Sequence, residues 1–390
     1  MSNLNQVFSS DTTRLQGRVY QLLRAKGRVA ALIKREVFPN GIGYAPITVN
    51  TLRSNPVGGS GWVAVAQEDG TANNCQVDPS VVTPALSTIS YTIEQQMTKS
   101  ATICLTDARF GYMFQEQVKN NRENFVSTIV DTWEDRSKYW YQYWAAHKII
   151  NNTSQTEGSG TAFPNTAATY IASQEQLDPL WTRIMQDGGG EEPYAMSNGA
   201  ACIPAIMSPE AHRNIIKGSS SVREDFRFAQ MGKGYEGAQL LQSWGVDKPY
   251  GGFMHVIDYR MPRYNFTSGA YVEVPYYTTA AATIGTQTIL NPDYESAGYE
   301  VIYLFHPEAV IRQTPAPLGS VGGDTKFLAN NYNGDIIWRN IPNETTNLFE
   351  NQGVWAAQLM AAWKPTVKRN YAYALMVKRC PSVVGTECAY

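Results

Sequence analysis

The sequence predicts an α+β fold that contains one unusually long helix. Two patterns lead to this prediction: a helical repeat of apolar residues that runs without a proline from Arg109 to Ile150, and short apolar runs separated by turn residues over most of the remaining chain. The chain has 390 residues, which is enough for two to three domains of about 150 residues each. A large buried core is therefore expected.

Residues 1–40 form a basic arm. Seven basic residues stand against Asp11 and Glu36, which gives this arm a net charge of +5. Apolar residues such as Val19 and Ile33 recur at roughly helical spacing, so part of the arm is expected to be an amphipathic helix with a cationic face. Such a face is either simply solvated or lies near a polyanion such as nucleic acid, attracted by phosphate without base readout. The seven basic residues are Arg14, Arg18, Arg24, Lys26, Arg28, Lys34 and Arg35.

The chain changes character over residues 41–106. Turn-forming and small residues dominate, and apolar residues occur in short alternating runs at 62–65 and 89–93. No lysine occurs between Lys34 and Lys99. The pattern predicts a long, extended, two-stranded excursion. Because an isolated hairpin is marginally stable in water, its apolar residues are expected to pack on a neighbouring molecule.

The helical pattern from Arg109 to Ile150 is the clearest feature of the sequence. Its aromatic residues recur at spacings of three, four or seven, Thr106 or Asp107 can cap its start, and Asn151 can end it. A helix of about 42 residues would be roughly 63 Å long. Its apolar face carries Trp and Phe rather than the Leu and Ile of a coiled-coil seam, so we expect it to span one face of a sheet.

The second half of the chain mixes short strands, short helices and turns. Ser208 followed by Pro209 predicts a helix start, because serine caps helices and proline suits the first helical position. That helix is expected to end at Lys217 and to follow a strand at 201–207, while another short helix covers 174–186. Further strands are expected at Phe253–Tyr259, Ala270–Tyr277, Tyr299–Phe305 and Tyr371–Val377.

Charge is scarce in this chain. Only 17% of the residues are charged and the net charge is −2, whereas about 25% is usual. The 23 Tyr and 9 Trp are of the type enriched in subunit contacts, so a large assembly and an aromatic, β-rich monomer both fit the composition. The chain contains no uninterrupted apolar stretch of about 18 residues, so no transmembrane helix is expected, and the N-terminal residues lack the apolar block of a secretory signal. We therefore expect synthesis in the cytoplasm, with the five cysteines as free thiols.

The sequence offers no motif for catalysis or metal binding. Its four histidines do not fall at ligand spacing, and it lacks both the G-x-S-x-G elbow and the G-x-x-x-x-G-K-[ST] phosphate loop. The run G-K-G-Y-E-G at 232–237 matches a dinucleotide fingerprint, with Asp258 placed 21 residues further on. However, polar residues precede it where a buried strand is required. We predict no enzyme activity and no catalytic, cofactor-binding or metal-binding residues.

The order of the predicted elements resembles that of the major capsid proteins of tailed bacteriophages, of the Hong Kong ninety-seven type. The resemblance covers essentially the whole chain and includes the short motifs G-S-G-T, S-P-E-A-H-R, K-P-Y-G-G-F-M-H-V-I-D and Y-A-Y-A-L-M-V-K-R. It implies five segments: an N-arm at 1–40, an extended E-loop at 41–106, a P-domain with the spine helix at 107–170, a mixed α/β A-domain at 171–365, and a closing P-domain strand at 366–390.

The same resemblance implies a structural function. The chain would self-assemble through hexamers and pentamers into an icosahedral shell that encloses double-stranded DNA. Its partners would be portal proteins, scaffolding or decoration proteins where they are used, and DNA held by non-specific electrostatics, with no membrane. The shell would be the virion capsid, assembled in the cytoplasm of a host bacterium. The basic arm would line the interior, and residues expected to pack between subunits are Trp62, Val63, Val65, Ile89, Trp133, Trp140 and Trp144.

Three family features are expected to be absent. Some members cross-link covalently through an E-loop lysine, but residues 41–98 contain none, so no such bond is expected. Only about 106 residues precede the long helix, which leaves no room for a built-in scaffolding segment, and a chain that begins at Met1 suggests no N-terminal cleavage.

The alternative to a capsid protein is a β-rich carbohydrate-binding or adhesive surface protein whose Trp and Tyr stack on sugar rings. An enzyme with convergent carboxylates comes third.

Overall fold

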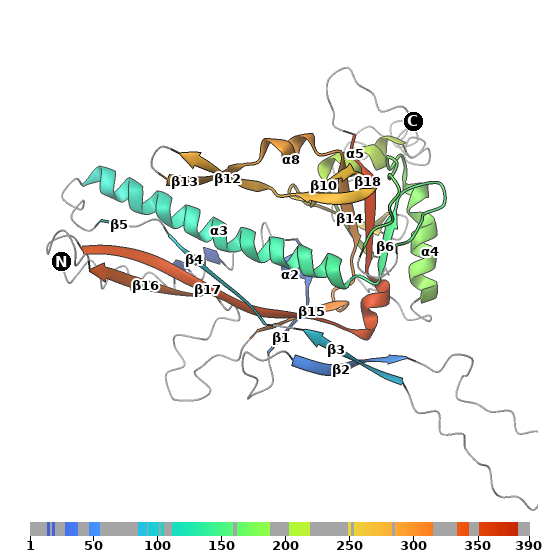
Figure 1. Cartoon of the computed structure of the whole chain (residues 1–390), viewed down its shortest axis with the longest axis horizontal. Coiled ribbons are helices and arrows are strands. Elements are labelled where there is room, and N and C mark those ends of the chain that lie inside the picture. The colour runs from blue at the N-terminus through green and yellow to red at the C-terminus, as the bar shows by residue number, and fades with distance from the viewer. Residues whose placement is uncertain are drawn as a thin grey trace, which may run out of the picture.

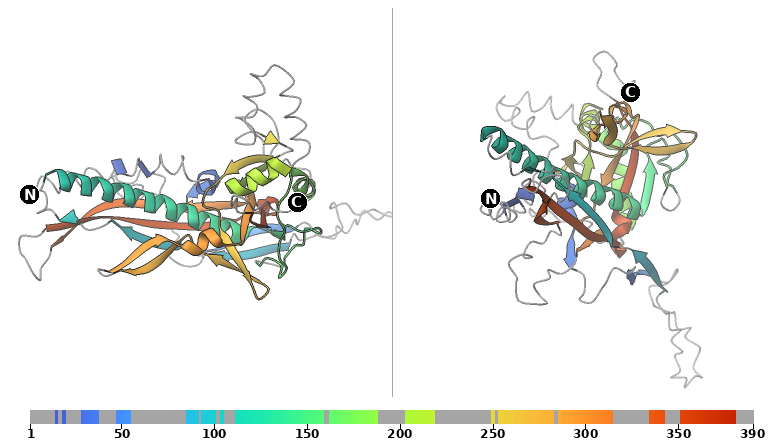
Figure 2. Two further views of the ribbon diagram at one scale, coloured as in Figure 1. Left: turned by 90° about the horizontal axis from the view of Figure 1, so that it is seen from above. Right: turned by 60° about the vertical axis from the view of Figure 1, so that its left-hand side comes forward.

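Two sheets and one long helix organise the described part of this computed structural model (Figure 1). An eight-stranded sheet lies at the C-terminal end of the helix, and a six-stranded sheet runs along its length, as both views of Figure 2 also show. The predicted α+β class is confirmed. The structure describes residues 14–15, 18–19, 28–37, 47–54, 85–91, 93–100, 103–104, 111–158, 162–187, 203–218, 249–250, 253–282, 285–314, 334–342 and 351–380.

The long helix, α3, covers Tyr112–Trp144, which is 33 residues and about 50 Å. The prediction that it continues to Ile150 is wrong, because the chain leaves the helix at Ala145 and His147–Ile150 forms strand β6. The apolar pattern continues through this break, but Ile149 and Ile150 are fully buried in the eight-stranded sheet instead. Lys148 donates from Nζ to the carbonyl oxygens of Tyr143 and Ala145, and so satisfies acceptors at the helix end. The predicted start at Arg109 lies outside the described residues.

The six-stranded sheet packs along α3. Its longest strand, β17 (Asn351–Pro365), pairs with β16 (Gly334–Pro342), β15 (Val310–Thr314), β4 (Glu94–Lys99) and β5 (Ile103–Cys104), while β1 (Arg35–Val37) pairs in parallel with β15. The ring of Trp133 on α3 meets that of Trp363 on β17 edge-on, with centroids 6.3 Å apart, and both side chains are buried. Large aromatic side chains thus fill the layer between helix and sheet.

The central strands of the eight-stranded sheet are buried on both faces. On β14 (Tyr299–Leu304), Val301 and Tyr303 enter the core that includes α3, whereas Ile302 and Leu304 enter the core beneath helices α4 (Asp178–Asp187) and α5 (Pro209–Gly218). The predicted cap of α5 is confirmed, since the Ala211 N–H donates to Ser208 Oγ at 3.1 Å. The other strands of this sheet are β6, β7 (Ile203–Met207), β8 (Pro249–Tyr250), β9 (Phe253–Ile257), β10 (Arg263–Thr267), β11 (Ala270–Val274) and β18 (Tyr373–Lys378).

Two antiparallel hairpins lie on opposite sides of α3 (Figure 1). One joins β2 (Ile47–Ser54) to β3 (Ala85–Tyr91), and the other joins β12 (Tyr277–Ala282) to β13 (Gly285–Leu290), which leads into the short helix α8 (Pro292–Ser296). In the part of the chain that is described, each hairpin is a two-stranded sheet of its own. The predicted two-stranded excursion therefore contains β2 and β3, but the later strands β4 and β5 join β17.

The predicted domain segments interleave in space. Strands β15 to β17 belong to the predicted segment 171–365, yet they share a sheet with β4 and lie against α3. Strand β18, in the predicted closing segment, pairs with β14 and β6. The boundaries at residues 170 and 365 stay predictions. Among the described helices, none has the length and apolar character that crossing a membrane requires.

Candidate functional site

The basic arm is attached to the long helix through one carboxylate. Helix α2 (Val29–Leu32) begins next to Glu134 of α3, and the backbone N–H groups of Val29 and Ala30 donate to Glu134 Oε1 and Oε2, both at 2.9 Å. All three residues are buried. Two otherwise unsatisfied N–H groups are therefore paired with the side chain of a residue about a hundred positions away in sequence.

A buried charge cluster continues from Glu134. Lys138 Nζ lies 2.6 Å from Asp258 Oδ2 and 3.5 Å from Glu134 Oε1, and it donates to the carbonyl oxygen of Arg260 at 2.7 Å. Burial lowers the pKa of Lys138, but the facing carboxylates of Glu134 and Asp258 outweigh it and raise the pKa overall. Asp258, which lies 21 residues after the G-K-G-Y-E-G run in the sequence, is thus the ion-pair partner of a buried lysine. Residues 232–237 lie outside the described part.

The seven basic arm residues are in different environments. Arg14 and Arg18 are exposed on helical turns, and the residue that follows each of them, Leu15 and Val19, is buried, so the predicted amphipathic pattern is present here. Arg28 and Arg35 are half-buried, and Arg24 and Lys26 lie outside the described residues.

Lys34 has an acidic partner in the described structure. Its Nζ lies 2.9 Å from Glu308 Oε1, and Lys368 Nζ lies 2.8 Å from Glu308 Oε2. Lys368 first, and then Lys34, lower the pKa of Glu308 to about 2. Lys34 is therefore engaged within its own subunit.

The residues expected to pack between subunits differ in how deeply they are buried within their own chain. Trp133 is fully buried inside its own chain, so the prediction that it contacts a neighbour is wrong: its ring fills the layer between α3 and β17 and has Arg312 stacked over it at 4.3 Å. Trp140 and Trp144 are half-buried, and Trp140 Nε1 donates to Glu94 Oε2 at 2.7 Å. Ile89 lies on β3, without a described side chain, while Trp62, Val63 and Val65 lie outside the described residues.

Sequence reasoning missed a tyrosine-lined groove between α3 and the segment that carries β10 to β12. The cavity has a volume of about 420 Å³. Tyr139 and Tyr143 of α3 are 45% and 40% exposed, and Tyr277 opposite them is 42% exposed. The remaining lining residues are Asp135, Lys138, Gln142, Lys148, Arg260, Met261, Pro262, Tyr264, Glu273, Val274, Pro275, Tyr276 and Tyr294. The high tyrosine content of the chain was the available signal, but it gave no position.

Arg260 holds the two sides of this groove together. Its guanidinium lies 2.6 Å from Asp131 and 2.8 Å from Asp135 on α3, and it stacks over the rings of Tyr276 at 4.4 Å and Tyr277 at 5.2 Å. Burial lowers the pKa of Arg260, but the two aspartates raise it overall, so the guanidinium is charged at any physiological pH. In the sequence these aspartates are two among many charged residues of the long helical pattern.

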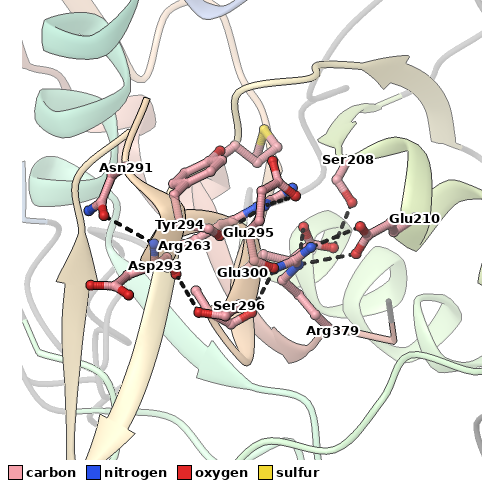
Figure 3. Close-up of polar contacts among 12 residues, drawn as sticks. Ser208, Glu210, Arg263, Asn291, Asp293, Tyr294, Glu295, Ser296, Glu300 and Arg379 are labelled. Carbon is pink, nitrogen blue, oxygen red and sulfur yellow. Dashed lines mark hydrogen bonds and ion pairs between the residues drawn. The ribbon is translucent and has the colours of Figure 1, made fainter. Parts of the chain in front are cut away.

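A second polar cluster joins α5, α8, β14 and the chain that follows β18 (Figure 3). Arg379, just after β18, contacts Glu210 of α5 in a bidentate ion pair and donates from Nη1 to the carbonyl oxygens of Glu295 and Ala297 at 2.9 and 2.6 Å. Beside it, Glu300 of β14 accepts from Ser208 Oγ at 2.6 Å.

Glu300 is the least exposed carboxylate of that cluster, at 1%. Its Oε2 lies 4.0 Å from Arg379 Nε. Burial raises the pKa of Glu300 to about 7, against the Ser208 hydrogen bond, which lowers it. Arg263, on the neighbouring strand β10, lies opposite Glu300 in register and bonds the carbonyl oxygen of Tyr294.

Two histidines that are 43 positions apart in the sequence lie side by side in the fold. His212 Nδ1 and His255 Nδ1 are 3.1 Å apart in the core beneath α5, and His255 Nε2 contacts Gln174 Oε1 at 3.2 Å. Within the described residues, no group of three or more His, Cys, Asp or Glu could hold a metal ion. The expectation of free thiols is wrong for Cys380, which is disulfide-bonded.

No protein-family model matches the chain, and no curated protein matches its sequence. Comparison with solved structures finds similarity to the capsid asymmetric unit of cyanophage Pam1, with 9% identity, a TM-score of 0.49 and coverage of 90% of this chain and 89% of that one. The capsid of Ralstonia phage GP4 is similar with 13% identity, a TM-score of 0.44 and coverage of 91% and 89%. A chain from Mycobacterium phage Che8 has 8% identity, a TM-score of 0.42 and coverage of 90% and 91%.

Proposed function

We propose that this chain is the structural subunit of a tailed-bacteriophage capsid, with the Hong Kong ninety-seven type of fold. The observation that carries the proposal is the pair of two-stranded hairpins on opposite sides of α3. A two-stranded hairpin is marginal alone and becomes stable when further strands or a helix cover it. A subunit with such hairpins on opposite sides is suited to head-to-tail contacts, which close into rings and shells.

The surface of the subunit supports the same proposal. Aromatic side chains that a monomer would bury are 40% or more exposed on α3 and on β12, where they line one groove. Arg14 and Arg18 are exposed and belong to an arm with a net charge of +5, which suits non-specific contact with packaged double-stranded DNA. The surface that carries these two arginines would face the interior of the shell, and the assembly would form in the bacterial cytoplasm.

The assembly proposed here consists of hexamers and pentamers of one chain, with a portal protein and, where one is used, a scaffolding or decoration protein. Catalysis has no part in it. The carbohydrate-binding alternative would require exposed aromatic residues at the ends of short strands. Tyr277, at the start of β12, is 42% exposed, but Tyr139 and Tyr143, which line the same groove, lie on a helix, and this alternative leaves the long helix and the basic arm without a role.

Negative-stain electron microscopy of the purified chain at high concentration tests the proposal. We expect rings or closed shells of uniform diameter, and light scattering that rises with protein concentration. A chain that stays a monodisperse monomer over a range of salt and protein concentrations, with and without a crowding agent, would contradict the proposal.

A further inference from the structure

The buried charge cluster on α3 holds a lysine in contact with two carboxyl groups. Lys138 Nζ lies 2.6 Å from Asp258 Oδ2 and 3.5 Å from Glu134 Oε1, and the side chains of Lys138, Asp258 and Glu134 are 2%, 7% and 8% exposed. Taking such charges out of water is costly, and replacing a buried ion pair by uncharged groups is often neutral or stabilising. An amine and a carboxyl group therefore lie in contact at a place where their charged forms are expensive.

The backbone of Arg260 holds both of these groups. Its N–H donates to Asp258 Oδ1 at 2.9 Å, and its carbonyl oxygen accepts from Lys138 Nζ at 2.7 Å. Groups that are fixed in contact react as if they were present at very high concentration. The folded chain thus positions the amine of Lys138 against the carboxyl group of Asp258.

The two oxygens of Asp258 are in different environments. A fixed backbone N–H such as that of Arg260 stabilises negative charge that develops on the oxygen it faces, which here is Oδ1. In the described part of the chain Oδ2 accepts no aligned hydrogen bond, although Nζ lies 2.6 Å away. Oδ1 is therefore suited to stay on the carbon atom, and Oδ2 is suited to leave it.

Glu134 is placed to carry protons in this site. Burial lowers the pKa of Lys138, but the two carboxylates raise it overall, so the resting lysine is an ammonium group. Burial also raises the pKa of Glu134, so this carboxylate takes up a proton more readily than an exposed one. Loss of a proton to a neighbouring carboxylate converts Lys138 into a free amine, which is the nucleophilic form of lysine.

We propose that Lys138 and Asp258 condense into an amide bond inside the folded subunit, with Glu134 as the proton carrier. The bond would join α3 to the residue that directly follows β9, and so link the long helix covalently to the eight-stranded sheet. A link between distant positions restricts the unfolded chain, as a disulfide does, but it resists reduction. The inference is independent of the proposed shell function, because all three residues belong to one chain.

The reaction balances without a co-reactant. Lys138 gives one proton to Oδ2 of Asp258, and the free amine attacks Cγ, so negative charge develops on Oδ1 beside the N–H of Arg260. Glu134 takes a second proton from Nζ and passes it to the Oδ2 hydroxyl, whose bond to Cγ breaks to release one water. Nζ keeps one hydrogen, Oδ1 becomes the amide oxygen, and Glu134 returns to its starting state. Lys138 lines the groove between α3 and β12, which gives the water a path to solvent.

Mass spectrometry of the denatured and reduced chain tests the bond directly. We expect the purified full-length chain to be lighter than its sequence mass by one water molecule. Trypsin does not cut after an acylated lysine, so a peptide with an uncut Lys138 should be joined to the peptide that contains Asp258. A chain that keeps its full sequence mass after days at neutral pH would overturn the proposal, and this measurement needs no variant to fold.

Two substitutions separate the bond from other dehydrations. Lys138→Arg keeps the positive charge but forms no amide, so it should have its full sequence mass. Lys148→Arg is the matched control, because Lys148 is also buried but donates from Nζ to the carbonyl oxygens of Tyr143 and Ala145. This control should still lose one water. A loss of water that persists in Lys138→Arg would place the dehydration elsewhere in the chain and overturn the proposal.

Glu134→Gln tests the proton carrier. Its amide does not take a proton from Nζ and return it, so the condensed fraction should grow about tenfold more slowly or less, measured in chains collected at increasing times after a pulse of synthesis. Glu116→Gln, at an exposed position of the same helix, should condense at the rate of the parent chain. Equal rates for Glu134→Gln and the parent chain would overturn the role given to Glu134.

Discussion

Arg379 donates two hydrogen bonds to the carboxylate of Glu210, from Nε at 3.1 Å and from Nη2 at 2.8 Å, and the two residues are 169 positions apart in the sequence. The pair ties the first turn of α5 to the chain that leaves β18, and the same guanidinium also bonds two carbonyl oxygens at the end of α8. One side chain with 1% exposure thus joins three elements that are far apart in sequence.

Replacing Arg379 with methionine is expected to destabilise the subunit by about 3 kcal/mol or more. The change removes a cation from a buried pair and leaves the carboxylates and carbonyls around it without their donor. Urea unfolding of the monomer, followed by tryptophan fluorescence, measures the loss. Lys119→Met, at an exposed position of α3, is the control and should shift the midpoint little. Equal midpoints for the two variants would contradict the role given to Arg379.

Glu300 is expected to make stability depend on pH in a defined direction. Burial raises its pKa from 4.5 to about 7, so the folded chain holds a proton that the unfolded chain has already released. Its contribution to stability is fully present below pH 4.5 and is lost as the pH rises through 7. In that window, the free energy of unfolding should fall by about 1.4 kcal/mol per pH unit on account of this group.

Glu300→Gln isolates this effect from other titrating groups. Burial lowers the pKa of His255 to about 3 and of His306 to about 4, and their contributions have the opposite sign because the unfolded chain binds more protons between pH 4 and 6.5. They are common to both proteins and cancel in the difference. The glutamine variant should therefore gain stability relative to the parent chain between pH 5 and pH 8, measured as urea midpoints. A constant difference over that range would show that Glu300 does not titrate there.

Some of the fold follows from local sequence, and the rest depends on contacts between distant segments. Ser208 caps α5 as expected because capping is a local property of a serine before a proline. The end of α3 was placed six residues too late, because Ile149 and Ile150 fit the helical repeat equally well. Their pairing with β18, more than two hundred residues later, decides the outcome.

The candidate sites show the same division. The arm could be recognised from its charge, because charge density is a sequence property. Its attachment to Glu134 could not, because the partner is one of many charged residues on a long helix. Trp133 was assigned to a subunit interface from its large apolar side chain alone, and only the presence of Trp363 across the layer shows that it belongs to the core.

Glu134→Gln is expected to loosen the arm without unfolding the long helix. The carboxylate accepts one N–H on each oxygen, whereas glutamine places an NH2 donor where one of these oxygens was. One of the two backbone N–H groups therefore loses its acceptor, and the change also removes one charge facing Lys138. Hydrogen exchange measured by mass spectrometry should become at least tenfold faster in the peptide covering residues 28–37 and change little in α3. Glu116→Gln, at an exposed position of the same helix, is the control. Unchanged protection of the arm would exclude the attachment.

Subunits in assembled particles are expected not to be cross-linked covalently through a lysine side chain. Residues 41–98 lack the lysine that such a bond uses in some capsids of the Hong Kong ninety-seven type. Denaturing gels of intact particles should show a single band near 43 kDa. The sample must be reduced first, because Cys380 is in a disulfide. A ladder of multimers that persists after reduction would contradict this prediction.

The exposed end of the basic arm is expected to carry its affinity for DNA. Arg14 and Arg18 lie exposed on one helical face, whereas Lys34 is paired with Glu308 and has little charge left to offer a phosphate. Each phosphate contact contributes about 0.9 to the slope of log K against log salt for duplex DNA. Replacing both arginines with glutamine should therefore reduce the slope by roughly 2, measured by titrating a labelled duplex at several salt concentrations, while Lys34→Gln should leave it nearly unchanged. The same double variant should assemble normally but package less DNA. Equal slopes for the two variants would show that binding does not distinguish the exposed arginines from the paired lysine.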